Sequence, residues 1–382
     1  MTNSILKTIR RHFMLTNSLT LACLAGLIFQ LAGSSAAQAH SFTFTGRMNE
    51  LRSHHTATLL ADGRVLIAGG LHAEPLQTAE LYDPATGTWS YTADLVIPQM
   101  NHSAVTLTDG RVLIAGGAVK GGNGTIPTNA AQVYDPVTAT WTTTGSMRGK
   151  RDSLTLQLLP DGRVLAATGT HGEDREASAT AEIYDPATGL WTRTGNLGVG
   201  TFNQIDASLP DGSVLVAGGD NDRVYALRGA EVFDPVTETW SRAGRMSTDR
   251  KSATAASLAD GSVLVVGGLS FDDGVLKTAD RYLPERSRWV PAGALVRSRW
   301  LARLVLLDDG RALLVGGNNT KLSGPRPYAD LYDPELNAWQ QLPEMQEARN
   351  HHTATLLADG SVLIAGGVNP AVQTDSAEIF RP

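Results

Sequence analysis

Five histidines stand at matching places in the chain, and their side chains could together bind a transition metal. His55, His102 and His352 occupy one equivalent position, and His54 and His351 occupy the position before it. Neutral imidazoles on adjacent strands are common ligands of such metals. The string HHTAT, however, occurs twice as part of a repeat, which favours hydrogen bonds to a neighbouring strand. We therefore predict that this cluster holds no metal ion and that the chain carries no cofactor.

Two charged residues stand where the corresponding segments have uncharged ones. Asp206 falls where the others have Ala or Leu, and Arg303 falls where they have Thr, Ser or Ile. A buried, unrepeated aspartate could act as a general acid or base if a substrate reached it. It could equally pair with an arginine of a neighbouring strand. Asp206 is therefore the candidate catalytic residue, and its role stays open.

Aromatic residues outside the repeated pattern indicate a binding surface. They are Phe202, Tyr225, Phe271, Trp300 and Tyr328, all in predicted loops. Arg297, Arg299 and Arg303 surround Trp300. An indole beside guanidinium groups suits an acidic sugar or a carboxylate-bearing peptide, because stacking and charge-assisted hydrogen bonds act together. We predict that these eight residues bind ligand, with Trp300 as the anchor.

A sevenfold repeat must position these residues. The string DG[RS]xL begins at Asp62, Asp109, Asp161, Asp211, Asp260, Asp309 and Asp359, with spacings of 47, 52, 50, 49, 49 and 50 residues. A period near 50 with glycine-rich, strand-like segments is typical of a β-propeller and not of a helical solenoid. Each repeat should therefore form one blade.

Four strands are predicted in each blade. In the first repeat, HTATLL and VLIAGG are apolar or β-branched runs joined by Asp-Gly, whose glycine allows a tight hairpin. AELYDP is the third strand, ended by a proline that cannot donate to the ladder, and a tryptophan opens the fourth. We name these strands a to d, from the first to the fourth.

The glycine pair, the Tyr-Asp-Pro segment and the tryptophan together resemble the kelch family over essentially the whole mature chain. That resemblance implies an all-β, seven-bladed kelch-type β-propeller over residues 40–382. The seventh repeat ends at Pro382 without a tryptophan strand. SFTFTGRM aligns with WSRAGRM of the fourth repeat, which puts Phe42 where Trp240 stands. Residues 41–45 should therefore close blade seven.

Residues that recur in most blades should serve the blade itself. Arginine enters strand a at Arg52, Arg151, Arg250, Arg299 and Arg349, while Gln99 and Thr201 replace it in two repeats. Kelch blades commonly have arginine here, which favours a structural role. The alternative is a ring of guanidinium groups that holds a carboxylate near the channel. The acidic residue before the Tyr-Asp-Pro aromatic recurs in six repeats and should be an architectural hydrogen-bond acceptor.

The first 39 residues read as an export signal. They contain no acidic residue, a basic start with Arg10-Arg11, an apolar run from Leu19 to Leu31, and an Ala37-Gln38-Ala39 cleavage site. The paired arginines resemble a twin-arginine signal, and an ordinary secretory signal is the alternative. We predict a signal peptide over residues 1–39 and a periplasmic or extracellular product.

Composition excludes several classes of protein. A formal charge of -6 without a basic tract argues against nucleic acid as a partner. The one cysteine, Cys23, lies in the signal, so the mature chain can form no disulfide. No second apolar run is long enough to span a membrane. We expect a monomer.

Function follows from the fold less directly, because propellers serve as binding modules and as enzymes. We expect an exported module that binds a glycan or an extracytoplasmic protein through the face carrying the b–c and d–a loops. The alternative is a carbohydrate-active enzyme (an epimerase, mutarotase or lyase) at the mouth of the central channel. Copper-radical oxidases of similar kelch fold need a cysteine cross-linked to tyrosine, which the mature chain cannot supply. Sialic-acid mutarotases of similar fold look six-bladed, and no catalytic motif carries over.

Overall fold

Short apolar strands and glycine turns build every blade in the same way. The structure is a computed structural model that describes residues 40–382 except 173, 175 and 371. The predicted signal peptide therefore lies outside the described residues. Each of the seven Asp-Gly turns joins strand a to strand b, and each turn glycine has a positive φ of 80° to 86°. L side chains rarely adopt that conformation, so glycine belongs there.

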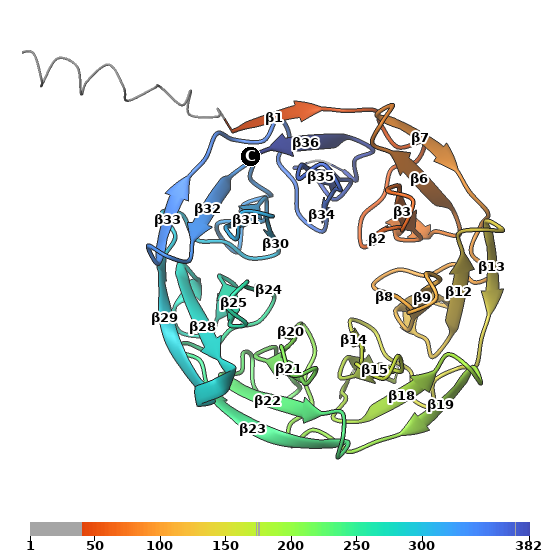
Figure 1. The fold of residues 1–382 in the computed structure, drawn as a ribbon, viewed down its shortest axis with the longest axis horizontal. Helices are drawn as coiled ribbons and strands as arrows, with labels where there is room; N and C mark the ends of the chain where they lie inside the picture. The colour runs from red at the N-terminus through yellow and green to blue at the C-terminus, as the bar shows by residue number, and fades with distance from the viewer. Residues whose placement is uncertain (1–39, 173, 175, 371) are drawn as a thin grey trace, which may run out of the picture. The chain divides into compact units, whose positions relative to one another are not determined.

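Seven four-stranded antiparallel sheets surround one axis (Figure 1). From the inner to the outer strand, the blades are β2 (Thr56–Leu59), β3 (Val65–Ala68), β6 (Ala79–Asp83), β7 (Thr88–Tyr91); β8 (Ser103–Thr106), β9 (Val112–Ala115), β12 (Ala131–Asp135), β13 (Thr140–Thr143); β14 (Thr155–Leu158), β15 (Val164–Ala167), β18 (Ala181–Asp185), β19 (Leu190–Arg193); β20 (Ile205–Ser208), β21 (Val214–Ala217), β22 (Gly229–Asp234), β23 (Thr239–Arg245); β24 (Thr254–Ser257), β25 (Val263–Val266), β28 (Thr278–Leu283), β29 (Arg288–Ala294); β30 (Arg303–Leu306), β31 (Ala312–Val315), β32 (Ala329–Asp333), β33 (Ala338–Gln341); and β34 (Thr353–Leu356), β35 (Val362–Ala365), β36 (Ala377–Arg381), β1 (Ser41–Phe44). We number them blades 1 to 7 in this order.

The first strand of the described chain closes the ring, as the repeat predicted. β1 pairs antiparallel with β36, and Phe42 lies opposite Phe380. Their ring centroids are 4.9 Å apart, which matches the contact between Tyr82 and Trp89 in blade 1. Phe42 therefore takes the place of the missing tryptophan, and blade 7 has no unpaired outer edge on strand c.

The hydrophobic core lies between the blades. Each of seven buried clusters combines residues of two adjacent blades, for example Leu66 and Leu81 of blade 1 with Ile114 and Tyr134 of blade 2. A blade thus buries its two faces only when both neighbours are present.

A buried arginine secures the start of strand a in five blades. Its guanidinium reaches the acidic side chain of strand c, as Arg52 does with Glu80 at 2.7 Å. The other pairs are Arg151–Glu182, Arg250–Asp280, Arg299–Asp330 and Arg349–Glu378. All five arginines are buried, so the structural role predicted for them is confirmed by their contacts. Blades 2 and 4 depart from this pattern.

The b–c and d–a connections lie at one end of the blades, because strand a starts where strand b ends. We call this end the loop face. Four b–c connections add a small hairpin, namely β4 (Leu71–His72) with β5 (Glu74–Pro75), β10 (Ala118–Gly121) with β11 (Gly124–Pro127), β16 (Thr170–His171) with β17 (Glu176–Ala177), and β26 (Leu269–Ser270) with β27 (Gly274–Val275). No helix within the described residues has the length and apolar character of a membrane span.

Candidate functional site

The inner ends of the seven blades enclose a polar pocket on the axis. Its volume is about 310 Å³. In Figure 1 the seven inner strands, from β2 to β34, face this axis. The lining residues start strand a or precede it; they are His54, His55, Asn101, His102, Ser103, Ser153, Leu154, Asn203, Gln204, Asp206, Ser252, Ala253, Leu301, Arg303 and His351. We call this space the axial pocket.

One residue per blade turns the chain into the axial pocket through a left-handed conformation. These residues are His54, Asn101, Ser153, Asn203, Ser252, Leu301 and His351, with φ between 48° and 58°. Left-handed backbone is strained for residues other than glycine, and it persists where the surrounding structure holds it. Peptide hydrogen bonds between neighbouring members hold it here. Five such N–H to carbonyl bonds have N···O distances of 2.9 to 3.3 Å. The seven residues form a belt around the axis.

The belt is interrupted at two places. Among the described residues, no peptide hydrogen bond joins Asn203 to Ser153, between blades 3 and 4, or His351 to Leu301, between blades 6 and 7. Side chains cross both interruptions instead. Gln204 Nε2 donates to the Ser153 carbonyl at 3.3 Å, and Arg303 Nε donates to the His352 carbonyl at 2.9 Å. The predicted departures from the repeat therefore lie where the belt is open.

Two histidines of the belt stack face to face. The imidazole centroids of His54 and His351 are 3.9 Å apart. The Nδ1 atoms share hydrogen bonds of 2.9 Å with Ser53 Oγ and with Asn350 Oδ1, respectively. Burial, and next Arg303, lower the pKa of His54 to about 4, and burial lowers the pKa of His351 well below its ordinary value. Both rings are neutral at pH 7, which permits the stacking.

The other three histidines point between blades. His55 Nε2 shares a hydrogen bond of 3.2 Å with Thr353 Oγ1, and His102 Nε2 shares one of 3.0 Å with Thr56 Oγ1. Both ring nitrogens of the buried His352 lack a hydrogen-bond partner among the residues that the structure describes. Within the described part of the chain, no three His, Cys, Asp or Glu side chains are grouped to hold a metal. That the cluster is metal-free stays a prediction, which elemental analysis of purified protein checks.

Arg303 brings a positive charge into the axial pocket, and no ion pair between described residues includes it. Its side chain is exposed in the pocket, although the crowding of protein atoms around it lowers its pKa. Its charge contributes to the low pKa of His54, His55, His351 and His352. A guanidinium surrounded by neutral imidazoles and partly accessible in a pocket is a binding site for an anion.

Asp206 lies on another side of the same pocket. Its Oδ2 accepts a hydrogen bond of 2.6 Å from Gln157 Nε2 of the neighbouring blade. Burial raises the pKa of Asp206, while hydrogen bonds from Gln157 and Thr155 partly oppose that rise. The alternative of an arginine partner is wrong, because Gln157 occupies that place. Asp206 keeps the accessibility and the raised pKa that a general acid needs.

The arginines beside Trp300 have separate environments. Arg299 is buried and paired with Asp330, so including it among the ligand contacts was wrong; its guanidinium belongs to the blade. Arg297 forms an ion pair of 3.0 Å with Glu344 and lies 3.9 Å from the Tyr328 ring centroid. Of the three predicted arginines, only Arg303 reaches the axial pocket.

The five loop aromatics lie outside the lining of the axial pocket. Tyr225 and Phe271 are exposed, with centroids 6.0 Å apart, and Lys251 Nζ lies 3.8 Å from the Tyr225 centroid. Trp300 is half-buried, and its Nε1 donates to the Thr320 carbonyl at 3.3 Å. The Arg297 guanidinium stacks on the Tyr328 ring. The half-buried Phe202 forms an isolated antiparallel β-bridge with Asp220 through its backbone. Trp300 therefore lies outside the lining of the pocket that Arg303 enters.

Gln157 and Gln204 are site residues that the predictions missed. Gln157 stands on strand a where other blades have Thr, Val or Ala, and Gln204 stands where others have His, Leu or Ala. Both depart from the repeat in the same way as Asp206 and Arg303. The same comparison, applied to uncharged polar residues, could have found them.

Comparison with known proteins agrees with this architecture. A model of the kelch motif matches residues 52–95 and 207–247. A fungal alcohol oxidase of the AA5 family, solved in complex with copper, is similar in structure with a TM-score of 0.73 and 18% sequence identity; the match covers 90% of this chain and 77% of that chain. The protein YjhT is similar with a TM-score of 0.60 and 15% identity, over 78% of this chain and 99% of that one.

Similarity at identities this low shows a shared fold alone. The described axial pocket has neither tyrosine nor cysteine in its lining, so its donor set does not fit the cross-linked copper centre that a copper-radical oxidase needs. The motif matches and the seven blades around one axis support the assignment of a kelch-repeat β-propeller.

Proposed function

We propose that the protein is an exported binding module whose axial pocket takes a hydroxylated ligand carrying a carboxylate, such as an acidic sugar of a glycan. The observation that carries this proposal is Arg303, whose guanidinium has no ion-pair partner among the described residues and lines a pocket of about 310 Å³. Export rests on the features of residues 1–39 and has its own test, which is the location and N-terminal sequence of the mature protein.

The polar groups of the pocket suit such a ligand. A carboxylate can accept two parallel hydrogen bonds from a guanidinium, and Arg303 uses its Nε for the His352 carbonyl. Asn101, Asn203 and Asp206 offer donors and acceptors for hydroxyl groups around the same space. The exposed Tyr225 and Phe271 would extend contacts with a longer glycan over the loop face.

Binding should be measured by calorimetry with the mature protein. The probes are glucuronate and galacturonate, their neutral counterparts glucose and galactose, and a peptide with a free terminal carboxylate. We expect one or more of the acidic probes to bind and the neutral sugars not to bind. Arg303→Thr, which installs the residue of four sister blades, should weaken binding about ten- to hundredfold, since hydrogen bonds to charged groups contribute about 1.5 to 3 kcal/mol.

Arg297→Ala is the matched control. This arginine lies on the loop face but pairs with Glu344, so its loss should leave the Kd unchanged. Equal binding of acidic and neutral sugars, or an Arg303→Thr variant with normal affinity, would contradict the proposal.

A carbohydrate-active enzyme is the second candidate, and the raised pKa of Asp206 favours it. A protonated carboxyl could transfer its proton to a bound sugar oxygen. Asp206→Asn preserves the shape of the side chain, and the amide oxygen can still accept the hydrogen bond from Gln157. If any bound probe is converted, this variant should lose turnover about a hundredfold or more while the Kd changes little. Conversion that persists in Asp206→Asn would exclude Asp206 as the acid.

A further inference from the structure

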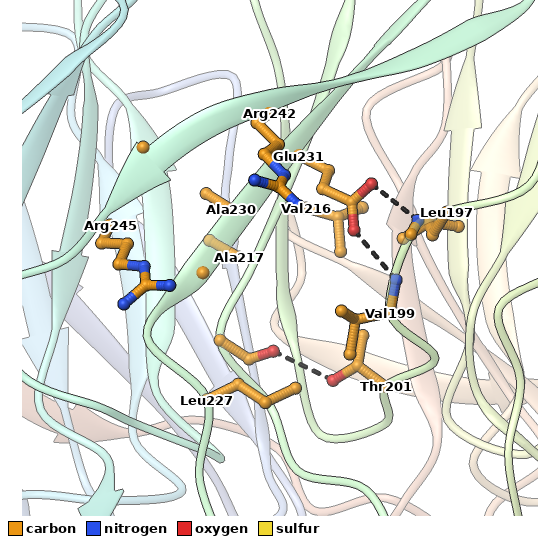
Figure 2. Close-up of a pocket in the computed structure, with 14 residues that line it drawn as sticks. Leu197, Val199, Thr201, Val216, Ala217, Leu227, Ala230, Glu231, Arg242 and Arg245 are labelled. Atoms are coloured by element: carbon orange, nitrogen blue, oxygen red, sulfur yellow. Dashed lines mark hydrogen bonds between the residues drawn. The ribbon is translucent and has the colours of Figure 1, made fainter.

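A second pocket lies within blade 4, away from the axis. Its volume is about 300 Å³, and it lies between the loop that precedes β20 and the strands β21, β22 and β23 (Figure 2). It shares no lining residue with the axial pocket. The inference drawn from it is therefore independent of the proposed function.

The corresponding space in five other blades is filled by the buried arginine. In blade 1, Arg52 Nη1 donates to the carbonyls of Gly69 and Thr78 at 2.9 and 3.1 Å. Its Nη2 donates to Thr78 Oγ1 at 3.1 Å and to Glu80 Oε1 at 2.7 Å. Two carbonyls, a hydroxyl and a carboxylate thus surround one guanidinium.

Blade 4 keeps most of these acceptors but lacks the arginine. Thr201 stands in its place, and Thr201 Oγ1 donates to the Gly218 carbonyl at 2.9 Å. Gly229 takes the place of Thr78, and a Cβ built there would meet no atom within 4 Å. The carboxylate of Glu231 remains. Compared with blade 1, blade 4 therefore lacks the arginine and the threonine side chains that fill this space, but it keeps the carboxylate.

The acid of blade 4 is also the most open of its kind. Glu231 is half-buried, whereas its counterparts in the other blades are buried. It still accepts hydrogen bonds from the backbone of Gly198 at 2.8 Å and Val199 at 3.2 Å. No ion pair between described residues includes Glu231.

Blade 2 shows how the same loss can be compensated. Gln99 replaces the arginine there, Gln132 replaces the acid, and the two amides bond to each other within the protein. Gln99 Nε2 also donates to the Gly116 carbonyl. Both partners changed in blade 2, but only the cation is lost in blade 4. A carboxylate in a partly enclosed space without its cation favours binding of a cation from outside.

We propose that the blade 4 pocket binds a guanidinium group, held by Glu231 and by the carbonyls of Gly218 and Gly229. The group belongs either to a small guanidino compound or to an arginine side chain of a peptide, and the experiment below separates these sources. Arg242 and Arg245 also line the pocket, and Arg242 lies opposite Glu231 in the register of β22 and β23. Their charges oppose a cation, so we expect weak binding to small probes.

Calorimetry and thermal melting with methylguanidinium chloride test the proposal, at constant ionic strength. We expect saturable binding that methylammonium chloride and urea do not reproduce, because the first lacks the planar fork and the second lacks the charge. The peptide acetyl-Gly-Arg-Gly-amide distinguishes the sources: binding at least tenfold tighter than methylguanidinium indicates a peptide arginine, and equal binding indicates a small compound.

Two substitutions locate the site. Glu231→Gln, which copies Gln132 of blade 2, should weaken binding at least tenfold without loss of the fold. Thr201→Arg should abolish binding and raise the melting midpoint, because the chain then supplies the guanidinium itself. Gln99→Thr is the matched control, since it opens the same space in blade 2 beside an uncharged amide and should create no second site.

Absence of saturable binding by both guanidinium probes would overturn the proposal, as would unchanged affinity in Glu231→Gln. Binding that appears only in Arg242→Ala would also overturn it, because the chain's own arginine would then occupy the space in solution.

Discussion

His102 shows how a single buried side chain makes stability depend on pH. Burial lowers its pKa to about 4, from an ordinary value of 6.5. An unfolded chain therefore binds a proton at this residue at higher pH than the folded chain does. The contribution is fully present above about pH 6.5 and is lost as the pH falls toward 4, which amounts to on the order of 3 kcal/mol. The depressed pKa values of His55, His351 and His352 act in the same direction.

We expect the free energy of unfolding, measured with urea, to decrease from about pH 7 to about pH 4.5. His102→Gln should reduce this slope, because Gln204 occupies the equivalent position in blade 4 and does not titrate. A flat profile in the unmodified protein, or the same slope in the variant, would show that His102 does not stay neutral in the fold.

At the scale of elements, β1 is the strand whose contribution can be measured most directly. Phe42 is 4% exposed and Phe44 is 55% exposed, although both lie on β1. Phe42→Ala should cost about 3 to 5 kcal/mol through lost burial and a cavity against Phe380. Phe44→Ala should change stability by less than about 0.5 kcal/mol. Urea denaturation of both variants checks this, and equal effects would contradict the assigned packing of β1.

The repeat predicted the blades, their strand order and the closure by residues 41–45, because each is specified by a local pattern that recurs seven times. The small hairpins such as β4 with β5 were not predicted, since the b–c loops differ between blades.

For the site, Asp206 and Arg303 were found as exceptions to the repeat. Arg299 was wrongly predicted to contact ligand, because it is adjacent to Trp300 in the sequence. As one of the repeated arginines of strand a, it instead pairs with Asp330 inside its blade. The replacement of the arginine by Thr201 was visible in the repeat, but the blade 4 pocket was missed, because only the surrounding atoms show that no other side chain of the described chain fills the vacated space.

At the scale of the whole ring, the two interruptions of the belt divide the inner circle into two arcs, one of blades 7, 1, 2 and 3 and one of blades 4, 5 and 6. Within each arc, neighbouring blades are tied at the axis by peptide groups; between the arcs, side chains alone make the tie. Farther from the axis, backbone hydrogen bonds from Gly169 N to the Thr201 carbonyl and from Gly317 N to the Arg349 carbonyl, together with buried apolar clusters, still join the two arcs. Asp206 lies at one interruption and Arg303 at the other. A ligand that contacts both residues would therefore add a connection between the arcs at the axis.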